Sequence, residues 1–268
     1  MIVFAPAKIN LGLLVLNKRP DHYHNLDSIF YPVPLFDFVE AVVADDFSLK
    51  ESGFRVAGSV VDNLLYKTWE LMRDRYGIGG LKVHLHKRIP MGAGLGGGSS
   101  DASALIKIIS TLYSLHLSIV EMERLAMEIG ADCPFFIRAK AVRARGIGNE
   151  FNKIELDLGA YYLVLVKPDI HISTAEAYSG VHLEGASTAL FADQIPPKEQ
   201  WNQTFVNSFE KHLFPKYPVL ANLKNQLIQM GAFYASMSGS GATIYGLFHE
   251  PPLIPRDWKQ HFVWSGKL

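Results

Sequence analysis

A glycine- and serine-rich stretch, PMGAGLGGGSSDASALI at residues 90–106, holds the residue types best suited to binding phosphate. Glycines let an anion approach the backbone closely, and the free amides and positive dipole end at the start of a helix attract negative charge. Ser99 and Ser100 add hydroxyl donors at that place. A flexible linker is disfavoured because a strand-like pattern precedes the stretch and a helical pattern follows it. The alternative interpretation is a tight strand-to-helix turn in which Ser99 or Ser100 caps the helix.

Two better known nucleotide-binding motifs do not fit this stretch. Gly92, Gly94 and Gly97 match G-x-G-x-x-G, but a dinucleotide fold also needs an acidic residue about 20 positions later. That position falls in residues 115–118, which lie in a helical pattern and include no acid. A nicotinamide-dependent oxidoreductase is therefore disfavoured. A Walker-type loop is disfavoured as well, because no G-K-[ST] follows the glycines.

A second glycine turn, Ser238-Gly239-Ser240-Gly241, stands near the end of the chain and precedes a strand-like run. Taken alone, it is equally well interpreted as a hairpin turn. Two separate loops of glycine and serine in one chain are better explained as two walls of one phosphate site.

One carboxylate and one ammonium group occupy unusual places. Asp132 lies between Gly130 and the apolar residues CPFFI, and Lys8 interrupts an apolar run near the N-terminus. A hydroxyl group is a poor nucleophile, so an enzyme that phosphorylates it needs a base, and a nearby cation keeps a carboxylate base ionised. Two plainer interpretations remain open: Asp132 as a cap or turn residue, and Lys8 on the solvent face of a strand.

The composition narrows the class of protein. The 26 basic and 26 acidic side chains cancel, which argues against a nucleic acid or an anionic membrane as partner. Cys133 is the only cysteine, so neither an internal disulfide nor a cysteine-based zinc site is possible, and it is better interpreted as a small buried residue than as a nucleophile. The ten histidines show no metal-ligand pairing; His84 and His86 alternate on a strand and are expected to face solvent. No signal peptide or membrane span is recognised, so we expect a soluble cytoplasmic protein without a protein-held metal.

Strand and helix patterns mix without a strict alternation, which predicts an α+β fold. Segments of alternating polar and apolar residues up to Phe54 predict further strands. A soft boundary between Asn149 and Ala160 gives predicted domains of residues 1–155 and 156–268. Gly77 and Gly130 end two of the predicted helices. Periodicity predicts strands at Ile2–Phe4, Leu11–Leu16, residues 81–90, Tyr161–Val166 and the run after the second loop, and helices at Asn63–Tyr76, Asp101–Leu115, Ile119–Ile129 and Leu220–Met230.

Three motifs together resemble the superfamily of galactokinase, homoserine kinase, mevalonate kinase and phosphomevalonate kinase. They are APAKINLGLLVLNKRPDHYHNL, PMGAGLGGGSSDASALI and SMSGSGATIYGLF. The first is the selective one, since P-A-K-I-N-L combined with D-x-Y-H-x-L is similar to the branch that phosphorylates a cytidine-diphosphate-linked methylerythritol. The segments GADCPFF, ARGIGNEF and VDNLLYKTWE are similar too, so the resemblance covers nearly the whole chain.

The resemblance implies a fold and a reaction. It implies an N-terminal domain like ribosomal protein S5 domain 2, a C-terminal ferredoxin-like domain, and an active site in the cleft between them. It implies that ATP, with Mg²⁺ brought in by its phosphates, phosphorylates the 2-hydroxyl of the acceptor in the non-mevalonate route to isoprenoid precursors. It also makes Lys8 and Asp132 the catalytic pair. We expect a monomer or weak homodimer.

The remaining site residues follow by position in the motifs. Substrate contacts are expected from Asn10, Tyr23, His24, Thr174 and Tyr178, with the rings of Tyr23 and Tyr178 on the two faces of cytosine and His24 at its edge. A packed helix residue is the alternative interpretation of Tyr178. Asn63 and Lys87 are expected on the adenosine side, although a helix cap and a solvated strand end are their alternatives. The other expected ATP contacts are Pro90, Met91, Gly92, Ala93, Gly94, Leu95, Gly96, Gly97, Gly98, Ser99, Ser100, Gly239, Ser240 and Gly241.

The chain departs from the family at His22, where D-G-Y-H is usual. If that position has a left-handed conformation, histidine tolerates it at a cost of about 1 kcal/mol. Two other functions remain open: a kinase of the same family acting on a small alcohol such as homoserine or mevalonate, and a nucleotide-binding protein without chemistry.

Overall fold

The computed structural model describes residues 1–56, 58–181, 189–191 and 194–268. Its contacts divide the chain into two compact units that are discontinuous in sequence. Unit 1 comprises residues 1–8, 35–91 and 96–140, and unit 2 comprises residues 9–34, 92–95 and 141–268. The domain boundary predicted at residue 155 concerns the family domains and stays a prediction.

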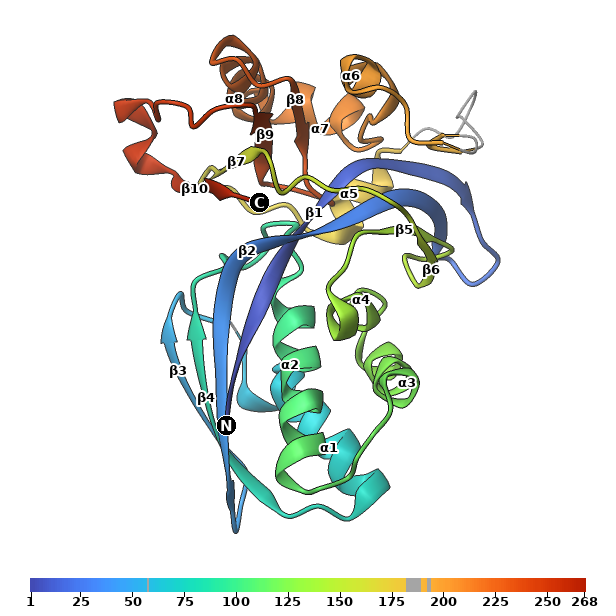
Figure 1. Ribbon diagram of the computed structural model, residues 1–268, viewed down its shortest axis with the longest axis vertical. Helices are drawn as coiled ribbons and strands as arrows, with labels where there is room; N and C mark the ends of the chain where they lie inside the picture. Colours follow the sequence, from blue (N-terminus) through green and yellow to red (C-terminus); the bar gives the residue numbers. More distant parts are fainter. Residues whose placement is uncertain (57, 182–188, 192–193) are drawn as a thin grey trace. The chain divides into compact units, whose positions relative to one another are not determined.

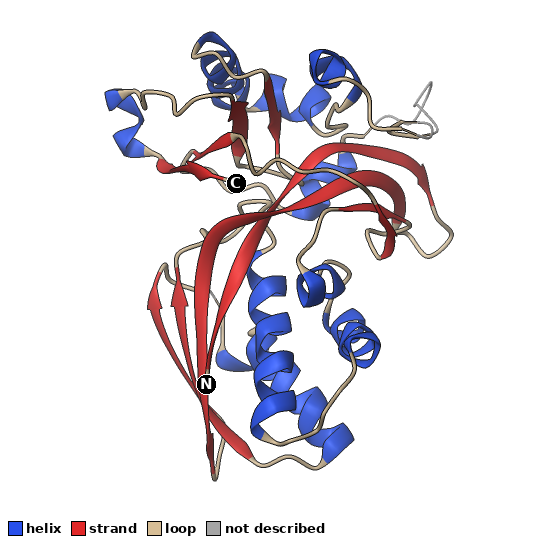
Figure 2. Ribbon diagram, in the orientation of Figure 1, coloured by secondary structure: helices blue, strands red, loops and turns tan. Residues whose placement is uncertain are grey.

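In unit 1, helices pack on strands of a mixed sheet (Figures 1 and 2). The order of strands is β3-β4-β2, with β1 also paired to β2; β3 is parallel to β4, and β4 is antiparallel to β2. One hydrophobic core joins residues of the sheet to residues of the helices. The strands are β1 (Ile2–Lys18), β2 (His24–Ala44), β3 (Ser48–Gly53) and β4 (Gly80–Lys87), and the helices are η1 (Val60–Asp62), α1 (Leu64–Tyr76), α2 (Gly97–Leu112), α3 (Ile119–Ile129) and α4 (Cys133–Arg138).

Unit 2 contains the remaining stretches of the long strands β1 and β2. It also contains a second sheet, which has the strand order β10-β7-β9-β8 and is antiparallel throughout. Helix α8 packs on strands β8 and β9 over a separate core. The strands are β5 (Val142–Arg145), β6 (Glu150–Lys153), β7 (Tyr162–Lys167), β8 (Tyr234–Met237), β9 (Ile244–Phe248) and β10 (Phe262–Lys267). The helices are α5 (Thr174–Ser179), η2 (Lys198–Gln200), α6 (Trp201–Thr204), α7 (Glu210–Lys216), α8 (Pro218–Gln229) and η3 (Arg256–Gln260).

Several predicted elements are confirmed together with their end signals. Helix α1 begins after Asn63, whose side chain accepts a hydrogen bond from the backbone N–H of Leu65, and ends at Gly77 in a left-handed conformation. Helix α3 has the predicted bounds and a capping box between Ser118 and Glu121. The predicted strands that became β4, β7 and β9 and the helix α8 are also present. The helices α1 and α3 were predictable because the apolar periodicity and the capping residues indicate the same bounds.

The prediction of two short N-terminal strands is wrong. Residues 2–18 form the single strand β1, and the polar residues Lys8 and Asn10 lie inside it, buried. They do not interrupt the strand because both side chains have polar partners, Asp132 for Lys8 and Ser28 for Asn10. A polar residue in a buried strand therefore marks a contact here rather than a break.

Helix α2 differs from its predicted bounds at both ends. It begins at Gly97 rather than Asp101 and ends at Leu112 rather than Leu115. Ser114 and His116 have positive φ angles, 51° and 49°, so the chain leaves the helix there despite the apolar residues that extend the pattern. In the described part of the chain, no helix combines the length and apolar character needed to cross a membrane.

Candidate active site

Unit 1 brings the two predicted catalytic residues together. Lys8 lies in β1 with only 4% of its surface exposed, and its Nζ is 3.4 Å from Oδ2 of Asp132. Asp132 precedes α4, but its side chain makes no capping hydrogen bond, and the side chain is 35% exposed. The interpretation of Lys8 as a solvent-facing lysine is therefore wrong. Asp132 does occupy a turn at the N-cap position of α4, as its alternative interpretation states, but its side chain is not used for capping. The geometry offers a carboxylate base with one side open and a buried cation beside it.

The start of α2 lies against this pair. Gly96 occupies the N-cap position with φ 71°, and a Cβ atom there would stand 2.6 Å from the Phe136 ring and 3.2 Å from Cγ of Lys8. The loop can therefore approach Lys8 only because residue 96 is glycine. The free amides of the first helical turn attract anions next to the Lys8–Asp132 pair.

The two serines of this loop are helical residues, and the cap interpretation is wrong. No side chain caps α2, and Ser99 and Ser100 fall within its first turn. Ser103, one turn further on, donates a hydrogen bond to the carbonyl oxygen of Cys133 at 2.7 Å, which ties α2 to the segment that carries Asp132. The Ser100 hydroxyl is buried without a hydrogen-bond partner in the described residues, so it is available to an incoming group.

Lys87 is neither a solvated strand end nor an exposed cation. It is 1% exposed, and its ammonium group donates to the carboxylates of Asp37 and Asp101, the latter at 2.8 Å. Asp37 Oδ1 also accepts hydrogen bonds from the backbone N–H groups of Arg88, at 2.5 Å, and Ile89, at 2.8 Å. This Lys87–Asp37–Asp101 triad joins the chain entering the glycine loop to the helix that leaves it. An adenosine contact from Lys87 stays a prediction.

Burial and the neighbouring charges shift the pKa values of Asp101 and Lys87 in the triad. Burial raises the pKa of Asp101 to about 7, and the negative charge of Asp37 raises it as well, while Lys87 lowers it. Burial by itself lowers the pKa of Lys87, but the charges of Asp101 and Asp37 outweigh that effect, so this pKa is raised. Lys87 is therefore a cation at neutral pH, and Asp101 is the carboxyl group that changes charge near pH 7.

This difference predicts a pH-dependent effect of Asp101→Asn. The carboxyl group has a pKa near ~3.9 in an unfolded chain, so its contribution to stability is complete below about pH 4. That contribution is lost as the pH rises through the folded value of about 7, because the unfolded chain releases the proton first. Thermal unfolding of both proteins between about pH 4 and 8 should show wild type losing stability relative to the variant. A constant difference would contradict the raised pKa.

The other expected adenosine-side residue, Asn63, caps α1 as its alternative interpretation states. Its Oδ1 accepts the bond from Leu65 at 2.9 Å, and its Nδ2 donates to Glu51 at 2.8 Å. Among the remaining loop residues, Pro90 is buried and Met91 is 43% exposed. A contact of Asn63 with adenosine stays a prediction.

Unit 2 brings the two glycine loops into contact. Ser238 Oγ donates to the carbonyl oxygen of Gly94 at 2.8 Å, and the N–H of Thr243 donates to that of Ala93 at 3.3 Å. A Cβ atom on Gly94 would clash with the Ser238 carbonyl oxygen, so only glycine fits there. The prediction that the two loops are neighbours is confirmed. Their use as phosphate contacts, by residues 92–95 and 239–241, stays a prediction.

Asn10 is buried next to the second glycine loop. Its backbone N–H donates to Ser238 Oγ at 3.3 Å, its side-chain Nδ2 donates to Ser28 at 2.8 Å, and its carbonyl oxygen accepts from the Tyr245 hydroxyl at 2.6 Å. The contacts hold Asn10 to the framework of the loops. Direct contact between Asn10 and substrate stays a prediction.

Two of the residues expected to bind cytosine, His24 and Tyr178, are in contact in unit 2. The rings of His24 and Tyr178 stack with centroids 4.8 Å apart and an interplanar angle of 23°. Burial lowers the pKa of His24, and the charge of Lys18 lowers it further, so the imidazole is neutral at pH 7 and presents one donor and one acceptor. The Tyr23 ring is 61% exposed, and Thr174 is exposed at the start of α5.

His22, where the chain departs from the family's usual glycine, has the left-handed conformation that was considered for it. His22 has φ 67°, in the left-handed region where the family's usual glycine is unstrained. Asp21 holds the turn, since its carboxylate accepts hydrogen bonds from the Tyr23 N–H at 3.1 Å and from Arg19. The loop that carries Tyr23 therefore keeps the backbone form that glycine would give it.

Sequence reasoning missed several residues that shape the site. Asp37, Ser28 and Asn207 carry no local pattern, because their partners lie far along the chain. His171 could not be found either, although its ring lies so near that a Cβ on Gly92 would be 2.9 Å from Nδ1. Cys133 is buried as predicted, and burial raises its pKa to about 12, which makes the thiol a poor nucleophile.

Two family models match parts of the chain, and curated relatives match it over its whole length. A model described as "GHMP kinases N terminal domain" matches residues 63–140, and one described as "GHMP kinases C terminal" matches residues 197–263. A 4-diphosphocytidyl-2-C-methyl-D-erythritol kinase of Parabacteroides distasonis is 44% identical over 270 residues, covering 100% of both chains. A protein of the same name from Azobacteroides pseudotrichonymphae is 47% identical over 252 residues, covering 94% of each.

Solved structures agree with the expected fold. A crystal structure of 4-(cytidine 5'-diphospho)-2C-methyl-D-erythritol kinase superimposes with a TM-score of 0.80 at 30% identity, covering 99% of this chain and 98% of the other. A homoserine kinase of Cytophaga hutchinsonii has a TM-score of 0.68 at 17% identity, with coverages of 99% and 93%, and shows the fold alone. The expected two-domain α+β fold is confirmed.

Proposed function

Because the chain belongs to the GHMP kinase family, we propose that it phosphorylates the 2-hydroxyl of 4-diphosphocytidyl-2-C-methyl-D-erythritol with ATP, a step of the non-mevalonate route to isoprenoid precursors. The observation that carries the proposal is the 3.4 Å contact of Lys8 with Asp132 beside the N-terminus of α2. A base, a cation and an anion-binding helix start are the groups that transfer of phosphate to an alcohol requires.

Asp132 is the proposed general base. Its carboxylate is partly exposed and makes no capping bond, so it can accept the proton of the acceptor hydroxyl as that oxygen attacks phosphorus. Lys8 is buried in β1, and its Nζ lies 3.4 Å from Oδ2 of Asp132, so its positive charge stands beside the base, where it can steer the hydroxyl oxygen. The proton ends on Asp132, and the γ-phosphoryl group leaves ADP for the hydroxyl oxygen.

The first turn of α2 is the proposed binding place of the ATP phosphates in unit 1. The amides of residues 97–99 precede the first intrahelical hydrogen bond, which runs from the N–H of Ser100 to Gly96, and the hydroxyl of Ser100 is buried without a partner among the described residues. An orphaned oxygen of this kind fits a phosphate with its Mg²⁺, since Mg²⁺ prefers oxygen ligands. When bound with ATP, Mg²⁺ neutralises charge on the phosphates. Ser100 is the residue we propose to face that group.

The proposed specificity comes from unit 2. The His24–Tyr178 stack is a flat aromatic surface, and neutral His24 can exchange hydrogen bonds with the edge of a cytosine. A small alcohol such as homoserine or mevalonate has no group that uses these rings. The high identity to relatives named for the cytidine-linked acceptor supports the same choice.

A coupled ADP-release assay tests the proposal by offering ATP with the cytidine-linked acceptor, mevalonate or homoserine at equal concentrations. We expect turnover with the cytidine-linked acceptor and a rate lower by at least about 10³-fold with mevalonate or homoserine. The transition states of these small alcohols lack the contacts between the protein and the cytosine ring. Comparable turnover of mevalonate or homoserine would favour a kinase of small alcohols. ATP binding without turnover of any acceptor would favour a nucleotide-binding protein.

A further inference from the structure

The second glycine loop has a conformation that its own hydrogen bonds do little to fix. It links β8 to β9, and Gly239 and Gly241 have φ angles of 56° and 92°. Two backbone hydrogen bonds close it, from Gly241 N–H to Ser238 at 3.0 Å and from Ser238 N–H to Thr243 at 2.9 Å. Glycines make such a loop deformable, so its shape depends on the groups around it.

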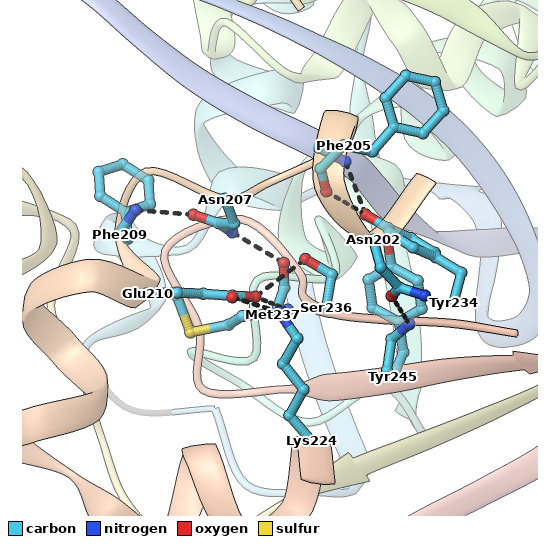
Figure 3. Close-up of polar contacts among 12 residues, drawn as sticks. Asn202, Phe205, Asn207, Phe209, Glu210, Lys224, Tyr234, Ser236, Met237 and Tyr245 are labelled. Atoms are coloured by element: carbon cyan, nitrogen blue, oxygen red, sulfur yellow. Dashed lines mark hydrogen bonds and ion pairs between the residues drawn. The ribbon is translucent and has the colours of Figure 1, made fainter. Parts of the chain in front are cut away.

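Asn207 supplies the main contacts around this loop (Figure 3). Its side chain is buried, and Nδ2 donates one hydrogen bond to the carbonyl oxygen of Met237 at 2.8 Å, drawn in Figure 3. A second hydrogen bond from Nδ2 goes to the carbonyl oxygen of Gly239 at 2.9 Å. Its Oδ1 accepts from the N–H of Phe209 at 2.9 Å. Both protons and the oxygen of the amide are used, which fits asparagine and no other residue of its size.

Glu210 holds the strand that leads into the loop (Figure 3). Its Oε1 accepts from the N–H of Met237 at 2.8 Å and from Ser236 Oγ at 3.0 Å, and its Oε2 accepts from Lys224 at 2.5 Å. The N–H of Met237 is therefore fixed by Glu210 and its C=O by Asn207. Residues 207 and 210 together clamp one side of the loop.

The segment that carries Asn207 is itself bonded to β1. The N–H of Leu13 donates to Val206 at 2.9 Å, and the N–H of Ser208 donates to Leu13 at 2.8 Å. On the far side of the loop, Ser238 donates to Gly94 of the first glycine loop. Within unit 2, the segment of Asn207 thus joins Leu13 of β1 to the second glycine loop, which in turn contacts Gly94 of the first.

We infer that Asn207 is a positioning residue that holds the second glycine loop in the shape that binds the phosphates of ATP. The inference rests on the proposed function for the identity of the nucleotide substrate. Asn207 acts through the carbonyl groups of Met237 and Gly239, not by touching ATP. Its loss leaves two carbonyl groups without donors and lets the loop move away from the neighbouring residues of the first loop.

Asn207→Asp is the sharpest variant, because it has nearly the same shape, keeps the acceptor for Phe209 and has no proton to donate. We expect its KM and Kd for ATP to rise about tenfold, the ratio that loss of ~1.4 kcal/mol produces, with a smaller change in KM for the acceptor. Hydrogen exchange at the N–H groups of Ser238 and Gly241 should accelerate. If this variant does not fold, Asn207→Ser, which keeps one donor and adds no charge, carries the same test.

Asn202→Ala is the matched control. Asn202 is an exposed residue of α6 whose side chain bonds to the backbone of Phe233 and Ala235 at the other end of β8, and it touches neither glycine loop. We expect it to lower thermal stability without changing KM or Kd for ATP. A rise in this control equal to that of the Asn207 variants would overturn the inference, since it would reflect lost stability alone.

The inference is also overturned if a folded Asn207 variant binds ATP within about twofold of wild type. The Kd for ATP is measured by calorimetry without an acceptor, and wild-type turnover of the cytidine-linked acceptor is measured separately. Failure of that turnover contradicts the proposed function, whereas the Kd comparison alone decides the role of Asn207.

Discussion

Replacing Asp132 with asparagine should reduce kcat by about 10²–10⁴-fold, the range that general base catalysis contributes. Asparagine matches the carboxylate in shape but cannot accept the hydroxyl proton. The anion-binding start of α2 is untouched, so ATP should bind nearly as it does to wild type. The measurements are steady-state ADP release and calorimetric titration with ATP.

Asp74→Asn is the control for this variant. Asp74 is exposed on α1 and paired with Arg73, so its replacement is expected to leave kcat unchanged. If Asp132→Asn kept a near wild-type kcat, Asp132 would not be the base. If it lost ATP binding in parallel with turnover, the carboxylate would serve nucleotide binding or local structure instead.

Replacing Lys87 with methionine should lower the free energy of unfolding by about 3–5 kcal/mol, the usual cost of removing one partner from a buried ionic group. The variant leaves the carboxyl groups of Asp37 and Asp101 buried with no cation between them. Because a carboxyl group can take up a proton, the loss should be smaller at pH 5 than at pH 8. Chemical denaturation at both pH values measures the effect.

Lys82→Met is the matched control, since Lys82 lies on the same strand β4 and is exposed. Its replacement should change the free energy of unfolding by less than about 0.5 kcal/mol. A loss at Lys87 no larger than the loss at Lys82 would show that the triad adds nothing to stability. A loss independent of pH would show that neither carboxyl group takes up a proton when the lysine is removed.

The sequence predicted those parts of the molecule whose signals are local. Helix α3 has its capping box and apolar period in one continuous stretch, and its bounds agree with prediction. Lys8 and Asp132 stood out because each is a charged residue in apolar surroundings, and the structure places them 3.4 Å apart. The left-handed conformation of His22 was raised only as a condition, from the glycine usual at that position, and the structure shows it with φ 67°.

Features that depend on distant partners could not be predicted. Lys87 was predicted as an adenosine-side contact with a solvated strand end as the alternative, because nothing near it in sequence shows that Asp37, 50 positions away, will meet it. The strand β1 looked broken because the partners of Lys8 and Asn10 are supplied by remote segments. The alternative that Ser99 or Ser100 caps α2 arose because glycine has a low helix propensity, whereas here the helix begins with Gly97 and Gly98.

Analysis of the product by ³¹P NMR and mass spectrometry tests the central claim most directly. With ATP and 4-diphosphocytidyl-2-C-methyl-D-erythritol, we expect ADP and one new phosphomonoester in equal amounts, with the new phosphate on the 2-hydroxyl. Formation of ADP without a phosphorylated acceptor, or phosphate on a different hydroxyl, would contradict the account.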